Sequence, residues 1–168
     1  MTQELFTIGH SNHRLQRFLE LLALHAIQLV CDVRSTPYSR FNPQYNRESL
    51  EATLGAHGID YLYLGDALGG KPRESGLPAD ETARFALIGK SDRFRRGLER
   101  LRAAAEAVPT AIMCAEKDPA ACHRGLLICP SLPEEIRIHH ILADGSLLDH
   151  RELARGTRSG DARQPSLL

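Results

Sequence analysis

The stretch IQLVCDV, residues 27–33, points to the fold of this chain. It is apolar almost throughout, which is typical of a strand covered on both faces. Four further runs have a strand-like composition, and segments with helical spacing of apolar residues separate them: LFTIG at 5–9, IDYLYLG at 59–65, TAIMC at 110–114 and IRIHHI at 136–141. Alternating strands and helices form parallel sheets with helical crossovers. We therefore predict an α/β fold: a single doubly wound, mainly parallel five-stranded sheet (Rossmann-like) with helices on both faces.

The first two helical segments carry start and stop signals. One begins near Leu15, where Ser11 or Asn12 offers a side-chain oxygen as N-cap. The other starts at Asn46, a second N-cap candidate, and stops at Gly58, because glycine tolerates the left-handed conformation that ends many helices. Both segments are expected to cross over between parallel strands.

Two further helices are expected nearer the carboxyl end. Helical periodicity returns at about residue 80 and continues through a strongly charged segment. The last helix is predicted over 119–127, where Asp118 would cap the first turn and Pro119 would occupy the first helical position. That helix would follow directly on the strand at 110–114.

The domain organisation follows from length and composition. We predict one α/β domain over residues 1–154, since 168 residues suffice for a self-contained core. A turn at Asp144-Gly145 indicates a short additional strand after the run at 136–141. Residues 155–168 contain few apolar side chains, and we expect them to form a flexible C-terminal tail.

Charge and composition weigh against several classes of protein, and they weaken a nucleic-acid-binding role without excluding it. Lys and Arg total 21, as do Asp and Glu, so no overall field attracts nucleic acid or a membrane surface. No window approaches the roughly 20 apolar residues of a membrane helix, and the N-terminal segment lacks a signal-peptide pattern. The four cysteines are expected to be reduced thiols of a cytoplasmic protein. The oligomeric state cannot be deduced from the sequence.

Residues capable of chemistry follow four of the predicted strands at their carboxyl ends. In open α/β sheets ligands bind at this edge, so the side chains should converge. The candidates for catalysis are Cys114, Glu116, Asp32, His10, Cys122 and His123, and those for ligand binding are Arg34, Arg124, Ser11, Arg40 and Lys71. Their convergence predicts an enzyme-like pocket for a small anionic or nucleotide-derived ligand, suited to a hydrolase or a transferase.

Cys114 and Cys122 are the two candidate reactive thiols. A cysteine near a helix N-terminus and an arginine has a lowered pKa, which makes it a better nucleophile. Buried cysteines also serve as small apolar fillers, and either role is open for this pair. Cys31 and Cys129 lie in apolar runs, where the filler role is expected.

The arginines have two interpretations as well. Arg34 and Arg124 present planar, permanently charged donors that would clamp an anion. Asp32 or Glu116 would then act as acid and base or orient these arginines. Alternatively, Asp32–Arg34 and Glu116–Arg124 are structural ion pairs that hold the edge of the sheet together.

The remaining candidates have less specific signals. His10 and His123 would move protons, because histidine titrates near neutral pH, although His10 also fits a turn that packs beside a helix. Ser11 is interpreted as an N-cap rather than a nucleophile, since no G-x-S-x-G elbow surrounds it. The Gly-rich segment 65–76, which contains Lys71, would close over the ligand as a lid.

Two alternatives belong to other classes of function. A nucleic-acid-associated module would use Arg40 and the Arg-rich segment SDRFRRGLERLR at 91–102. A non-catalytic metal-binding protein would combine Cys114, Cys122 and His123 with His10 or Asp32. The spacing is not C-x-x-C, and neighbouring residues on a helix point about 100° apart. We therefore assign neither a metal nor a cofactor to the pocket.

Several motifs together resemble one uncharacterised family of bacteria and archaea. They are TIGHS at 7–11, DVRSTPYSRFNPQYN at 32–46, YLYLGDALGG at 61–70 and CAEKDPAACHR at 114–124, followed by HI at 140–141. The combination is similar to the family catalogued as domain of unknown function number 488. The resemblance implies a compact α/β domain and no established reaction. Its motifs coincide with the predicted strand ends, which favours a shared pocket.

Overall fold

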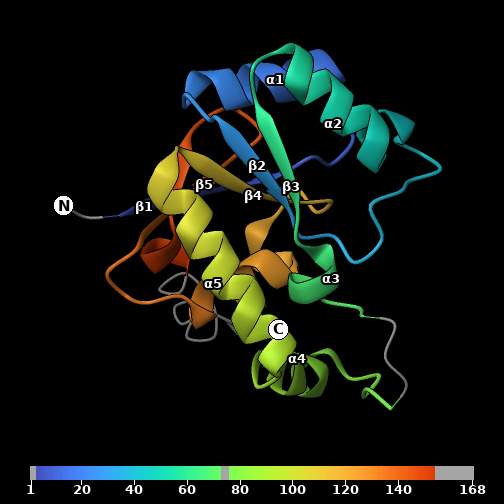
Figure 1. Ribbon diagram of the computed structural model, residues 1–168, viewed down its shortest axis with the longest axis vertical. Helices are drawn as coiled ribbons and strands as arrows, with labels where there is room; N and C mark the ends of the chain where they lie inside the picture. Colours follow the sequence, from blue (N-terminus) through green and yellow to red (C-terminus); the bar gives the residue numbers. More distant parts are fainter. Residues whose placement is uncertain (1–2, 73–75, 154–168) are drawn as a thin grey trace, which may run out of the picture.

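The protein has a six-stranded sheet with helices on both sides (Figure 1). The computed structural model describes residues 3–72 and 76–153. The strands are β1 Glu4–Gly9, β2 Leu29–Asp32, β3 Asp60–Tyr63, β4 Thr110–Cys114, β5 Arg137–Ile141 and β6 Leu147–Asp149. Their order is β3-β2-β4-β1-β5-β6, and β1 to β5 pair in parallel. A mixed α/β fold with a mostly parallel sheet is thus confirmed.

The predicted number of five strands was wrong. Strand β6 pairs antiparallel with β5 and forms the sixth strand. The chain reverses at Asp144 and Gly145, and Gly145 has a φ of 90°, which glycine adopts without a Cβ penalty. The short additional strand predicted after this turn is β6 itself. It closes one side of the sheet as a hairpin and ends directly before His150.

Helices cover the two faces of the sheet and enclose two separate layers of core. Helices α1 Leu15–Leu24 and α2 Arg47–Ala56 pack on one face, while α3 Gly65–Leu68, α4 Glu81–Gly89 and α5 Asp92–Ala107 lie on the other. Strand residues alternate between the two layers: Val30 and Met113 face α1 and α2, whereas Cys31 and Cys114 face the α5 side. Both Cys114 and the segment that follows β4 therefore lie on the α5 side.

The predicted helix starts are confirmed in one case and corrected in another. The N-cap residue of α1 is Arg14, so Ser11 and Asn12 do not cap this helix. The backbone at Ser11 is in the left-handed region, with a φ of 48°, and its amide donates to the carbonyl of Ala115. Asn46 does occupy the N-cap position of α2, but its side chain accepts from the amide of Ser39 instead.

The helix predicted over 119–127 is replaced by three short turns. They are η2 Pro119–Ala121 and η4 Cys129–Ser131, both 3₁₀, and η3 Arg124–Ile128, a single turn of π-helix. Asp118 caps the first of them as expected, with its Oδ1 accepting from the Ala120 amide at 2.9 Å. Cys122 is extended and interrupts the run. Four of the five residues of η3 are buried and only the apolar Leu126 is exposed, so the segment lacks the polar exposed face of an amphipathic helix.

Three predictions about the whole chain have different outcomes. None of the helices among residues 3–72 and 76–153 is both long and apolar enough to cross a bilayer. The flexible tail predicted over 155–168 lies outside the described residues. The single domain over 1–154 stays a prediction.

Candidate functional site

A cavity opens at the carboxyl ends of the central strands. Strand β4 lies between β1 and β2. Gly9 at the end of β1 pairs with Cys114, and Asp32 at the end of β2 pairs with Met113, so the three strands end side by side. The cavity measures about 410 Å³. It is lined by Arg34, Ser35, Thr36, Gly70, Lys71, Glu81, Arg84, Phe85, Cys114, Ala115, Glu116, Ala121, Cys122 and His123. Both candidate thiols therefore face one space at the edge that the sequence predicts.

Cys114 and Cys122 are in direct contact on the cavity wall. Their sulfur atoms are 3.1 Å apart, and both cysteines are free thiols. The hydrogen bond from the Cys114 thiol lowers the pKa of Cys122, and Arg124 adds to this effect. The same hydrogen bond, together with burial, raises the pKa of Cys114. The lowered pKa of Cys122 and the raised pKa of Cys114 make Cys122 the more acidic thiol of the pair.

Arg124 is the largest fully buried side chain of the described residues, with an exposed fraction of 0 %. Its Nε donates to the sulfur of Cys122 at 3.2 Å, and its Nη1 donates to Thr7 Oγ1 at 2.7 Å. Its Nη2 donates to the carbonyl oxygens of Glu116 and Lys117, both at 3.1 Å. The guanidinium thus donates its hydrogen bonds to Thr7, to the 116–117 loop and to the Cys122 sulfur, and it does not line the cavity.

Glu116 meets Arg124 through its backbone and not through its carboxylate. The Glu116 side chain is exposed, and no carboxylate of the described residues lies within 4.0 Å of Arg124. The structural ion pair considered for these two residues is therefore absent. Gly9 explains the close approach of the backbone, because a Cβ at this position would overlap the carbonyl of Glu116.

Asp32 and Arg34 form a bidentate ion pair in the interior. Arg34 donates from Nε to Oδ1 at 2.9 Å and from Nη2 to Oδ2 at 2.8 Å. The Arg34 amide and the hydroxyl of Tyr61 take the remaining acceptor positions, at 3.1 and 2.6 Å. Arg34 also donates to the carbonyl of Tyr45 and still lines the cavity. Of the two roles considered for Asp32, these contacts favour orientation of Arg34.

His10 is buried beside this ion pair and does not line the cavity. Burial is the main reason why the pKa of His10 falls to about 4. Its Nδ1 donates to the carbonyl of Ser11 at 2.8 Å, and its Nε2 accepts from Arg34 at 3.3 Å. The ring also stacks on Tyr45, with centroids 4.4 Å apart. These contacts favour a neutral packing residue over a proton shuttle.

His123 lines the cavity and is held in one orientation. Its Nε2 donates to the carbonyl of Val33 at 2.8 Å, which leaves Nδ1 as the acceptor nitrogen. Burial lowers the pKa of His123, so the ring is neutral near pH 7. Gly70 packs against it, because a Cβ on Gly70 would lie 2.9 Å from the His123 Cβ. A neutral imidazole is thus fixed on the wall of the cavity that holds the two thiols.

The other predicted site residues are distributed unevenly. Lys71 lines the cavity, whereas Ser11 and Arg40 do not. The segment 65–76 begins with helix α3, and residues 73–75 lie outside the described residues, so the predicted lid is untested. Arg84 and Phe85 also reach the cavity, from α4, and were not among the predicted site residues. The N-cap Asp80 and the helical periodicity from about residue 80 signal this helix, but neither indicates which face meets the edge of the sheet.

The fold and the site define a class of protein: an α/β domain with a paired-thiol pocket at the carboxyl edge of a mostly parallel sheet. The chain belongs to the family described as domain of unknown function DUF488, whose model matches residues 14–129. The resemblance seen in the sequence is thereby confirmed. Neither the curated proteins nor the solved structures contain a match to the chain.

Proposed function

We propose that the protein is a thiol-dependent hydrolase or transferase for a small anionic or nucleotide-derived substrate, with Cys122 as the nucleophile. One observation carries the proposal: the sulfur of Cys122 is the only side-chain acceptor that could carry a negative charge within hydrogen-bond distance of the buried Arg124 guanidinium, among the described residues. A fully buried cation without a counter-charge is strongly unfavourable. The ionised form of Cys122 supplies this charge, so the fold itself favours the thiolate.

Charged and aromatic groups around Cys122 support an anionic substrate. Lys71 and Arg84 line the same cavity, and Arg34 retains an unused N–H on Nη1 that can donate to a ligand. These cations face two lining carboxylates, one of which, Glu81, lies 3.9 Å from Arg84. The Phe85 ring adds an apolar face on which a base could stack, which extends the proposal to nucleotide-derived ligands.

The proposed chemistry proceeds in two steps. The Cys122 sulfur attacks an electrophilic acyl or phosphoryl centre, and the leaving group departs with the electron pair of the broken bond. Neutral His123 then accepts a proton through Nδ1 from water, in a hydrolase, or from an acceptor hydroxyl, in a transferase. The activated oxygen attacks the centre and releases the Cys122 thiolate. Arg124 acts through the thiolate as a positioning residue.

A pair of alkylating reagents tests this proposal without knowledge of the substrate. Iodoacetate is anionic and iodoacetamide is neutral, while both attack thiolates. We expect Cys122 to prefer iodoacetate several-fold more than a free thiol does, because cations attract anions to the cavity. Lys71→Ala and Arg84→Ala should reduce this ratio, and Lys90→Ala, whose lysine does not line the cavity, should not. A ratio equal to that of free cysteine would refute anion selection.

The distance between the two sulfur atoms favours a second candidate, a dithiol redox site. Cys114 and Cys122 are separated by 3.1 Å, compared with about 2.05 Å in a disulfide. The Cys122 thiolate would attack a small disulfide and release one thiolate, and Cys114 would then displace the second half. The disulfide of a low-molecular-weight thiol is reduced as the pair is oxidised. A protein mass two hydrogens lower after exposure to such a disulfide is the expected result, whereas Cys114→Ser should stop at a mixed disulfide that adds the mass of one small thiol to Cys122.

The two alternatives from other classes of function can be tested separately from this proposal. For the nucleic-acid module, binding of duplex and single strands at graded salt should show no measurable affinity at low salt. On α5, Arg95 is already paired with Asp92 at 2.8 Å. For the metal-binding protein, the proposed ligands do not fit, because His10 and Asp32 are bonded to Arg34.

A further inference from the structure

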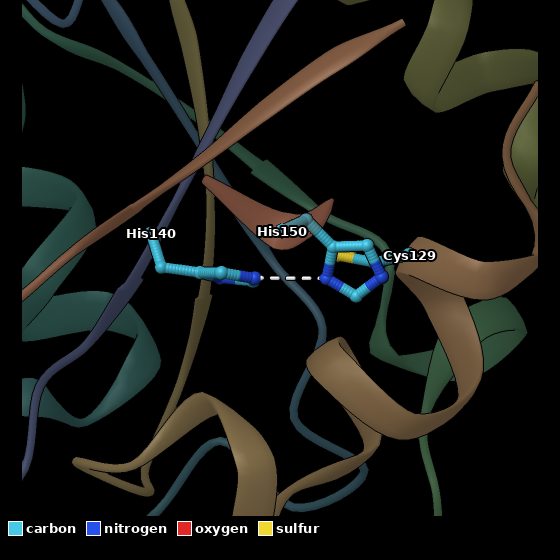
Figure 2. A group of neighbouring side chains, drawn as sticks. All are labelled: Cys129, His140 and His150. Atoms are coloured by element: carbon cyan, nitrogen blue, oxygen red, sulfur yellow. Dashed lines mark hydrogen bonds between the residues drawn. The ribbon is translucent and has the colours of Figure 1, made fainter. Parts of the chain in front are cut away.

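A second cluster of reactive side chains lies away from the thiol pair. Figure 2 shows Cys129 at the start of η4, His140 on β5 and His150 just after β6, all pointing toward one another. Each offers a ligand atom, and these three atoms lie within 4.8 Å of one another. The Nε2 of His140 and the Nδ1 of His150 are 3.0 Å apart. Three segments distant in the sequence thus converge on one point.

We infer that Cys129, His140 and His150 form a binding site for a divalent cation of the zinc class. One thiolate and two imidazoles are donors that zinc prefers. Zinc bonds of about 2.0–2.1 Å to nitrogen and 2.3 Å to sulfur place tetrahedral ligand atoms about 3.3–3.6 Å apart. The observed spacing approaches this geometry, so only small side-chain movements are needed to enclose the ion.

A supporting residue fixes His140 for this role. Thr7 and His140 are paired on neighbouring strands, and Thr7 Oγ1 lies 2.6 Å from the Nδ1 of His140. When the Thr7 oxygen accepts the Nδ1 hydrogen, the lone pair of Nε2 is free to bind a metal. Such a hydrogen bond from the second ring nitrogen is the usual arrangement for a metal-bound histidine. The chain therefore provides an orienting partner as well as the ligands.

The cluster is buried on one side and reachable on the other. His140 is fully buried, while Cys129 and His150 line a second cavity of about 440 Å³. Glu134, Asp149 and Arg151 also line this cavity. Arg137 donates to the Asp149 carboxylate at 3.5 Å, and Arg151 donates to the Glu134 carbonyl at 3.2 Å. Three protein ligands leave a fourth position that water or a small ligand can occupy from the cavity. The site thus has the open coordination of a catalytic or exchangeable ion.

This inference is independent of the proposed thiol chemistry. The mechanism at Cys122 uses none of the three residues, and the sequence alone assigned Cys129 a filler role. A cysteine that only fills apolar space needs no metal-ligating group beside it, yet the imidazoles of His140 and His150 each have a ring nitrogen within 4.8 Å of the Cys129 sulfur. Arg124 links the regions through its 2.7 Å hydrogen bond to Thr7 and through its carbonyl, which accepts from the backbone amide of Cys129.

Titration of the metal-free protein with Co²⁺ tests the site, because cobalt reports thiolate and imidazole ligands through its absorption. We expect one bound equivalent, a sulfur-to-cobalt charge-transfer band and competition by Zn²⁺. Cys129→Ser should abolish the charge-transfer band, and His150→Ala should weaken binding at least tenfold. The matched controls Cys31→Ser and His139→Ala remove a buried thiol and the neighbouring strand histidine, and both should bind normally.

Variants of the pair Cys114 and Cys122, together with the wild-type protein, distinguish this metal site from metal binding elsewhere. A cobalt band that persists in Cys129→Ser and disappears in Cys122→Ser would assign the metal to the other cavity and overturn the inference. Absence of stoichiometric binding in the wild type would do so as well. Should Cys129→Ser fail to fold, Cys122→Ser decides: the cobalt charge-transfer band should persist in this variant, and its loss contradicts the site.

Discussion

The Nε of Arg124 lies 3.2 Å from the sulfur of Cys122, in the interior of the protein. All other hydrogen bonds of this guanidinium reach neutral oxygen atoms of Thr7, Glu116 and Lys117. A buried charge requires a partner, and in the proposed function the Cys122 thiolate is that partner. Arg124 therefore connects the packing of the fold with the reactivity of one cysteine.

The buried pair of Asp32 and Arg34 should matter more for stability than an exposed pair. Asp32→Asn removes the charge that compensates Arg34 and should lower the free energy of unfolding by about 3–5 kcal/mol. Asp92→Asn, which breaks the exposed pair with Arg95 at 2.8 Å, is the matched control and should cost less than about 1 kcal/mol. Urea denaturation measures both. Equal losses would show that burial does not distinguish the two pairs.

Gly9 should be intolerant of a methyl group, unlike Gly55. Gly9→Ala forces the Glu116 carbonyl away and disturbs its hydrogen bond to Arg124, so both stability and Cys122 alkylation should fall. At Gly55, on α2, an alanine methyl would meet no atom within 4 Å apart from its chain neighbours and the backbone of its own helix, and alanine should stabilise the helix by up to about 1 kcal/mol. Thermal melts of both variants check this. A neutral Gly9→Ala would mean that the 116–117 loop can move without consequence.

His10 should make the protein less stable in mild acid. Its pKa is about 4 in the folded state and 6.5 in the unfolded state, so the unfolded chain binds more protons between these values. Stability is therefore present above pH 6.5 and is lost as the pH falls toward 4. This residue should contribute a loss of about 2 kcal/mol between about pH 7 and pH 5.

The variant His10→Asn isolates this contribution, because asparagine keeps a donor near the position of Nδ1 and does not titrate. Its urea midpoint should change less between the two pH values than that of the wild type. The groups facing the ring are Arg34, Asp32, Ser11 and His13, and they are unchanged in the variant. His57→Asn, at an exposed position, should retain the wild-type slope. An identical slope in His10→Asn would assign the acid sensitivity to other groups.

Thr7 should affect the inferred metal site through His140. Thr7→Val keeps the shape of the side chain and removes the 2.6 Å contact to Nδ1, so Co²⁺ should bind about 10–100-fold more weakly. Thr110→Val removes another buried hydroxyl, which donates to the Val108 carbonyl at 2.8 Å, and serves as control. Equal cobalt affinity in both variants would exclude Thr7 as the orienting partner.

The strands and the sheet edge could be predicted from the sequence because their signals are local. Apolar runs such as 110–114 require burial on both faces, and parallel strands bring their carboxyl ends together. Placement of Cys114, Cys122 and His123 on one cavity follows from that geometry. The 3₁₀ and π turns after Asp118 were not predictable, because the burial of Arg124 is a tertiary effect that overrides the local helix signal.

Other features depend on contacts between distant segments. Arg40 and Ser11 follow strands, yet they do not reach the cavity, because the direction of a loop after a strand is set by packing. Cys129 looks apolar in its own run, and only the β5–β6 hairpin brings His150 to it. Arg84 and Phe85 reach the cavity from α4. The amphipathic pattern of this helix is weak, because Ile88 is its one buried residue. Such long-range placements leave no local pattern.

The pH dependence of Cys122 alkylation tests the central claim most directly. Iodoacetamide labelling, followed peptide by peptide, gives a midpoint for each thiol, and Cys31 is an internal reference because burial raises its pKa to about 12. We predict a Cys122 midpoint at least one unit below the ordinary value of about 8.5, and an upward shift in Arg124→Met. A wild-type midpoint at or above that ordinary value would show that the buried guanidinium is not balanced by a thiolate and would contradict the account.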